Sequence, residues 1–103
     1  MTKSENLQQF MELEKEKINN ELHNLNDANI EQRMCKRTAH SLFAIMLCEM
    51  DIKLAKSSNE DPWETIKEYI NIDSKKYENS PMKDTYSEII KKLNEKITEL
   101  EES

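Results

Sequence analysis

The sequence contains no glycine, and this absence constrains its fold more than any motif in it. Tight β-hairpin turns rely on residues that tolerate a positive φ, glycine above all. A chain of 103 residues without glycine therefore favours helices joined by short polar links over a sheet built from hairpins. The same absence excludes the phosphate-binding loops that depend on glycine, both the Walker A loop and the dinucleotide-binding fingerprint.

Apolar residues recur at helical spacing in four segments of the chain. This pattern predicts an all-α fold, either a four-helix bundle or paired helical hairpins whose core is completed by dimerisation. We expect a single helical domain over residues 1–103, with helices at about 4–25, 28–56, 62–78 and 81–101. One long bent helix over residues 4–56 is the alternative for the first two, because neither proline nor glycine interrupts that range.

Capping residues mark where these helices begin. Asp61 and Ser80 each precede a proline, and a capping residue followed by proline is a frequent helix start. Ser4 is the expected cap of the first helix, and Asp27, within a link rich in Asn and Asp, is the expected cap of the second. Each expected helix therefore has its own start signal.

The segment at residues 28–56 differs from the others because its apolar residues occupy more than one side. A broad face, which we expect in the core, contains Met34, Cys35, Ala39, Leu42, Ile45, Met46 and Ile52. A second strip has the spacing of residues that pack against another helix, and it contains Phe43, Leu47, Met50 and Leu54. Two explanations of the second strip stay open. It faces the other helices of this chain, or it is the interface to a partner or to a second copy.

Two polar features lie on the same segment. Arg33, Lys36, Arg37 and His40 follow helical spacing and form a basic patch in a chain whose net charge is −6. Such a patch binds a phosphate group or an acidic surface, or it pairs with acidic residues of neighbouring helices. Glu49 lies within the broad apolar face, where a carboxylate needs a partner, water or a proton.

The residue patterns of the common catalytic and metal sites are missing. Neither His23 nor His40 follows a glutamate by three residues, as a di-iron carboxylate bundle requires. Cys35 and Cys48 lack the short ligand spacing of zinc sites. On one helix these cysteines are about 20 Å apart, so we expect reduced thiols that do not pair. We therefore expect no enzyme activity, no bound metal and no cofactor.

Charge and hydropathy limit the environment of the chain. Its 15 Lys and Arg are interspersed among 21 Asp and Glu, which disfavours binding to nucleic acid or to anionic membranes. No apolar run approaches the ~20 residues of a membrane-spanning helix, and no secretory signal precedes the charged start. With two unpaired thiols, these features favour a cytoplasmic, intracellular protein.

These features together predict a protein that binds other macromolecules. A small acidic helical chain without a catalytic pattern is expected to act as an adaptor, inhibitor or regulator, and a homodimer is the expected assembly. Size and composition favour, within this class, an antagonist of a host system from a phage or mobile element. The alternative is a protein that sequesters or senses a phosphorylated small molecule through Arg33, Arg37 and His40.

Overall fold

The structure is a computed structural model, and it describes residues 2–25, 30–57, 60–76 and 79–102, without the side chains of residues 72–76. The described residues form four helices and no strand, so the prediction of an all-α fold is confirmed. The helices are α1 (Lys3–Asn24), α2 (Ile30–Lys56), α3 (Trp63–Lys76) and α4 (Lys83–Glu102).

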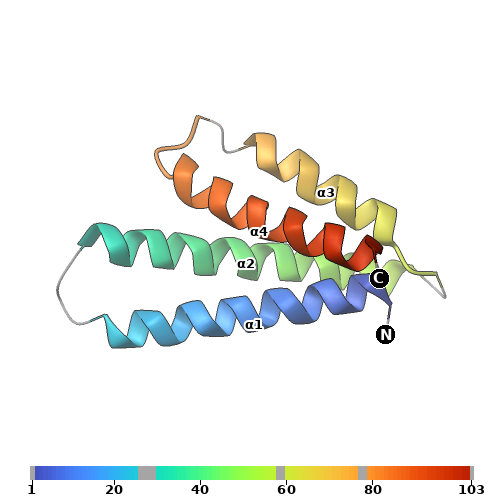
Figure 1. Cartoon of the computed structure of the whole chain (residues 1–103), viewed down its shortest axis with the longest axis horizontal. Helices are drawn as coiled ribbons and strands as arrows, with labels where there is room; N and C mark the ends of the chain where they lie inside the picture. The colour runs from blue at the N-terminus through green and yellow to red at the C-terminus, as the bar shows by residue number, and fades with distance from the viewer. Residues whose placement is uncertain (1, 26–29, 58–59, 77–78, 103) are drawn as a thin grey trace.

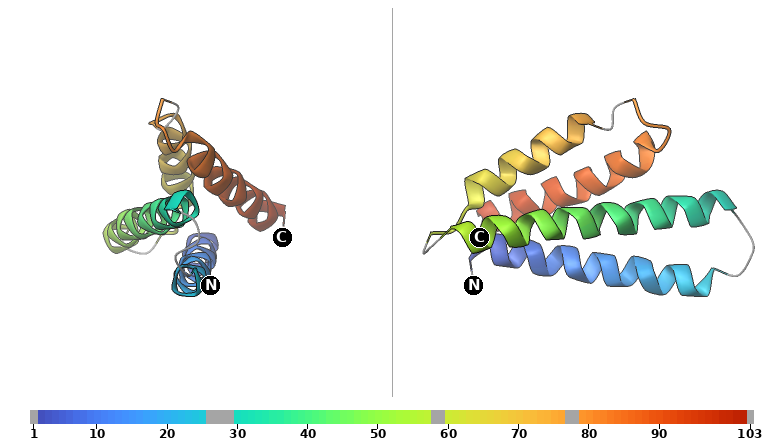
Figure 2. Two further views of the ribbon diagram at one scale, coloured as in Figure 1. Left: turned by 90° about the vertical axis from the view of Figure 1, so that its left-hand side faces the viewer. Right: turned by 180° about the vertical axis from the view of Figure 1, so that it is seen from behind.

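The four helices pack as two antiparallel pairs. α1 and α2 run side by side along the long axis of the molecule, and the pair of α3 and α4 lies against them (Figure 1; Figure 2). α4 contacts both helices of the first pair as well as α3. The first two helices are therefore separate rather than one bent helix, because α1 ends at Asn24 and α2 returns alongside it. None of the described helices combines the length and apolar character needed to cross a membrane.

The first helix begins earlier than the expected cap. The Glu5 N–H donates to Thr2 Oγ1 at 3.1 Å, and the Thr2 N–H donates to Glu5 Oε1 at 3.3 Å. This reciprocal capping box requires a glutamate three residues after the cap, and Glu5 stands in that position relative to Thr2. Ser4, the expected cap, instead lies inside the first turn and is buried. The expected cap of the second helix, Asp27, lies outside the described residues.

The two helix starts that contain proline lie close to their expected positions. α3 begins at Trp63, and the Pro62 carbonyl accepts the Ile66 N–H at 3.0 Å. Before α4, the Ser80 hydroxyl accepts the Met82 N–H at 3.1 Å. Proline suits both places because its missing N–H has no partner to lose in a first turn.

The core lies where the four helices meet. Its most deeply buried apolar side chains are Leu7 and Met11 of α1, Leu42, Phe43, Met46 and Met50 of α2, Ile66 and Ile70 of α3, and Leu93 of α4. Glu14 of α1 lies beside the core, where its carboxylate forms an ion pair with Lys92 Nζ of α4 at 3.6 Å. Burial of one such aliphatic side chain contributes about 1.5–3 kcal/mol, so these residues account for much of the stability.

Candidate functional site

The second strip predicted on residues 28–56 faces the inside of the molecule. Phe43, Leu47 and Met50 are buried, and Leu54 is half-buried. Helices of the same chain therefore cover these side chains, which is the first of the two explanations that the sequence left open. We name these four residues the inner strip of α2.

The broad apolar face does not lie in the core as a whole, and this corrects the expectation from sequence. Its members Ala39, Leu42 and Met46 are buried. Met34 and Ile45, by contrast, are 56% and 55% exposed. The physical reason is that α1, α3 and α4 contact only part of the circumference of α2. In the end-on view, α1 lies below α2 while α3 and α4 lie above and to its right, which leaves one side of α2 without a described helix (Figure 2).

That uncovered side carries a continuous uncharged strip. Residues spaced alternately four and three apart, as in the a and d positions of a coiled coil, are Met34, Thr38, Ser41, Ile45, Cys48, Ile52 and Ala55. Thr38 is half-buried and the other six are exposed. Five large apolar side chains are exposed in the described part of the chain, and three of them belong to this strip. We name these seven residues the outer strip of α2.

The outer strip is hollowed near its middle. Thr38, Ser41 and Ile45 line an open groove of about 230 Å³, together with Leu42, Arg37 and Tyr86 of α4. The hollow arises because the small Ser41 lies between larger neighbours one helical turn away on each side. Leu42 is buried, so the groove has an apolar side chain beneath it. A partner side chain of aliphatic size fits such a depression better than a flat helix face does.

Charged residues flank the outer strip. Arg37 and Asp51 are exposed and lie two heptads apart along the same edge, where the Gln8 side chain of α1 donates a hydrogen bond to Asp51. On the other edge, Glu49 lies 4.0 Å from Lys53, and its side chain is 43% exposed. Glu49 is therefore neither isolated nor deeply buried, and its position in an apolar pattern marks the edge of the strip.

The predicted basic patch lies beside α1 and is partly neutralised there. Lys36 pairs with Glu21, and its hydrogen bond lowers the pKa of the Glu21 carboxyl below the usual value. Arg33 and His40 are half-buried, and Arg37 is exposed. The four residues share one side of α2 through their helical spacing, and the ion pair of Lys36 with Glu21 offsets part of their positive charge.

A cleft that no sequence pattern indicates lies between α1, α2 and α4, next to this patch. Its volume is about 380 Å³, and the buried side chains of Ile18, Phe43 and Ile89 are among its lining. Four glutamates and three lysines also line it, so its charge is close to balanced. Helices that are distant in the sequence build this cleft together, which is why no local motif could indicate it.

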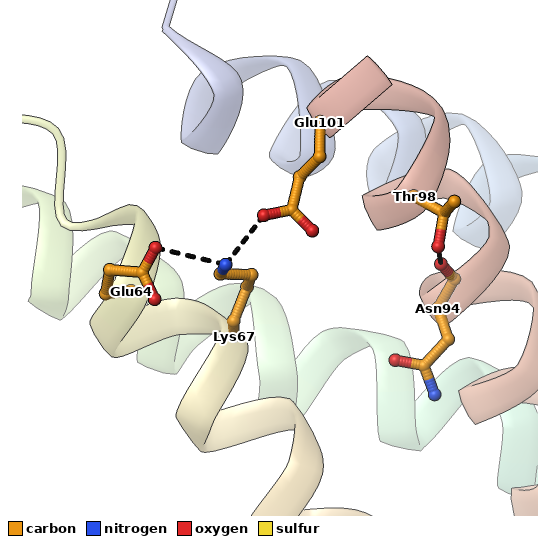
Figure 3. Close-up of polar contacts among 5 residues, drawn as sticks. All are labelled: Glu64, Lys67, Asn94, Thr98 and Glu101. Carbon is orange, nitrogen blue, oxygen red and sulfur yellow. Dashed lines mark hydrogen bonds and ion pairs between the residues drawn. The ribbon is translucent and has the colours of Figure 1, made fainter.

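A lysine of α3 joins the two helices of the second pair. Lys67 Nζ lies 2.7 Å from Glu101 Oε2 of α4 and 3.0 Å from Glu64 Oε1 of its own helix (Figure 3). The hydrogen bond from Lys67 lowers the pKa of the Glu101 carboxyl. The pKa of Lys67 is raised, mainly by this hydrogen bond to Glu101 and next by the one to Glu64. This cluster ties the two helices together.

Metal ligands do not gather anywhere in the described part of the chain. No three side chains of His, Cys, Asp or Glu come together there in an arrangement that could hold a metal ion. Cys35 and Cys48 are both free and exposed. The thiol of Cys48 belongs to the outer strip, where a small apolar side chain suits packing.

Comparison with known proteins assigns the chain to no family. No protein-family model matches the chain, and no curated protein or solved structure matches it either.

Proposed function

We propose that this protein acts by binding another macromolecule through the outer strip of α2, as an adaptor, inhibitor or regulator rather than as an enzyme. The observation that supports this proposal most directly is the strip itself: seven successive a and d positions without a charge, in a chain whose residues are 35% charged. Exposed apolar side chains at this spacing are typical of a helix that packs against a second helix.

The length of the strip indicates what kind of partner fits. From Met34 to Ala55 it covers about 32 Å at 1.5 Å per residue. A partner helix of similar length can follow the whole strip, whereas a short peptide would leave part of it in water. We propose a cytoplasmic setting, in which Cys48 stays a thiol and packs as a small apolar side chain. A host protein targeted by a phage or mobile element is one partner of this kind.

Thiol labelling tests the binding role of the strip. The reporter protein carries Cys35→Ser and Leu13→Cys, so that one thiol, Cys48, lies in the strip and the other lies at a position that is 61% exposed on α1. In lysate of the native host, we expect Cys48 to be alkylated more slowly than the thiol at position 13. Ile45→Glu in the same protein should speed the alkylation of Cys48 alone, because a charge in the strip prevents packing. Equal labelling rates of Cys48 with and without Ile45→Glu would contradict the proposal.

A second candidate function is the binding of a small phosphorylated molecule, and the cleft between α1, α2 and α4 favours it. Its volume lies within the range of small-molecule pockets, and Lys17, Lys36 and Lys92 line it together with apolar side chains. Thermal melting with inorganic phosphate, nucleotides and sugar phosphates tests this candidate, because a ligand of the folded state raises Tm. A rise that Lys36→Ala abolishes supports it. An unchanged Tm with every anion removes it.

A further inference from the structure

The spacing, the groove and the charges of the outer strip together identify its occupant. We infer that the strip packs against the outer strip of a second copy of this chain, with the two α2 helices antiparallel. This inference rests on the binding role proposed above for the same strip, and it specifies the partner.

The heptad positions define how two copies align. Thr38, Ile45 and Ile52 occupy a positions, and Met34, Ser41, Cys48 and Ala55 occupy d positions. In an antiparallel pair of helices, each a residue faces a d residue of the other helix. One alignment, with its twofold axis passing near residue 43, sets Ile45 against Ser41, Ile52 against Met34, and Thr38 against Cys48 of the second copy. Every large side chain of the strip then has a facing residue.

The groove fits this alignment. Thr38, Ser41, Leu42 and Ile45 have the spacing of the four-residue hole that receives a side chain from a facing helix. Arg37 and Tyr86 of α4 line the same groove. The antiparallel alignment sends Ile45 of the second copy into this groove of about 230 Å³, and the twofold axis repeats the contact. A parallel alignment would bring Ser41 against Ser41 and Ile45 against Ile45, which leaves the groove without a side chain large enough to fill it.

Charge also favours the antiparallel alignment. Arg37 and Asp51 lie on the same edge of the strip and are both exposed. The antiparallel alignment places Arg37 opposite Asp51 of the second copy, and the symmetry forms this opposite-charge pair twice. A parallel alignment would place Arg37 opposite Leu42, which is buried, and Asp51 opposite Lys56. Only the antiparallel alignment gives Arg37 an opposite charge.

The oligomeric state of the purified full chain tests the pairing. Sedimentation should show a dimer for the natural sequence. Ile45→Glu should weaken dimerisation by at least about a hundredfold, because it places a charge at the centre of the contact, while circular dichroism stays helical. The matched control is Leu13→Glu, at a residue that is 61% exposed on α1 and about 140° around that helix from Gln8, the neighbour of Asp51. It should remain a dimer. A monomeric natural protein overturns the inference.

Charge exchange tests the direction of the two helices. Arg37→Asp alone and Asp51→Arg alone should each weaken dimerisation about tenfold, because each creates two like-charge pairs, and the double variant should recover it. Gln8→Ala is the control for Asp51→Arg, since it removes the hydrogen-bond partner of Asp51 without adding charge. If Arg37→Asp has no effect while Asp51→Arg weakens the dimer and the double variant fails to recover, the helices are parallel and the antiparallel inference is overturned.

The failure of this inference is distinguishable from failure of the proposed function. A purified protein that is monomeric, but whose Cys48 is protected in lysate and released by Ile45→Glu, binds a different protein through the strip; the second copy is then overturned and the binding role stands. If Cys48 reacts equally fast with and without Ile45→Glu, in purified protein and in lysate, both are overturned.

Discussion

Ile45 and Leu47 lie two residues apart on α2 and face opposite sides of it, with Ile45 55% exposed and Leu47 6% exposed. Two residues correspond to a rotation of about 200° around an α-helix, so the two side chains cannot share an environment. One apolar stretch of α2 therefore contributes side chains both to the core and to the proposed contact surface.

This relationship predicts opposite outcomes for the same substitution. Leu47→Glu should unfold the chain or destabilise it by several kcal/mol, because the new carboxylate is buried without a partner. Ile45→Glu should leave the monomer folded. Its free energy of unfolding should lie within about 1 kcal/mol of that of the natural sequence in its monomeric form. Urea denaturation followed by circular dichroism measures both. Equal destabilisation by the two changes would show that Ile45 and Leu47 do not differ in burial as the structure has them.

A milder change measures the packing of the inner strip. Leu47→Ala removes buried atoms and should lower the free energy of unfolding by about 2–5 kcal/mol. This cost combines the lost burial with the cavity that the smaller side chain leaves behind. Ile45→Ala, at the exposed position, is the matched control and should cost less than about 1 kcal/mol in the monomer. A comparable loss at both sites would argue against the burial difference.

The assignment of the first helix cap can be tested at Thr2 and Ser4. Thr2→Ala removes the hydroxyl that accepts the Glu5 N–H, and it should destabilise the protein by about 0.5–2 kcal/mol. Ser4→Ala should be neutral or stabilising, because the buried Ser4 hydroxyl has no hydrogen-bond partner among the described residues. Thermal melting of the two variants compares them directly. A larger loss for Ser4→Ala would restore Ser4 as the cap.

The contact between Lys67 and Glu101 predicts how stability changes with pH. Because the folded protein lowers the pKa of Glu101 from 4.5, this carboxylate stabilises the fold above that pH, and its contribution is lost as the pH falls through the lower, folded pKa. Glu101→Gln should therefore reduce the loss of stability on acidification from neutral pH. The urea midpoint measured from pH 7 down to pH 3 follows this effect. The control is Glu95→Gln, at an exposed residue of the same helix. Between pH 7 and pH 3 it should lose more stability than Glu101→Gln does.

The groove at Ser41 predicts a size-dependent effect on dimerisation. Ser41→Leu fills the groove that Ile45 of the second copy would enter, and it should weaken the dimer without unfolding the monomer, because Ser41 is exposed. Ser41→Ala keeps the groove open and should leave dimerisation unchanged or stronger. Sedimentation equilibrium separates the two variants. Equal dimerisation of both would contradict the fit between Ile45 and the groove.

Much of the fold could be predicted from the sequence because the signals for helices act over a few residues. The absence of glycine, the prolines after Asp61 and Ser80, and single apolar stripes such as that of α4 all indicate helices with defined starts. The strip of Leu93, Ile97 and Leu100 is buried as its spacing predicts, because a helix with one apolar side has one way to face a core. The expectation of a cap at Ser4 was wrong, although the glutamate three residues after Thr2 was a local signal for the cap that the structure shows.

The sequence by itself determined an all-α fold and the starts of the third and fourth helices, since helical spacing and caps depend on residues close together in the chain. The tertiary structure decided that α1 and α2 are separate helices, because α2 returns alongside α1. Which side of α2 faces inward was decided only by the tertiary structure. α2 is apolar on more than one side, and spacing alone cannot tell which of those sides α1, α3 and α4 cover. Packing buried Leu47 and left Ile45 in contact with solvent. The same packing formed the cleft, because helices that are distant in the sequence line it together.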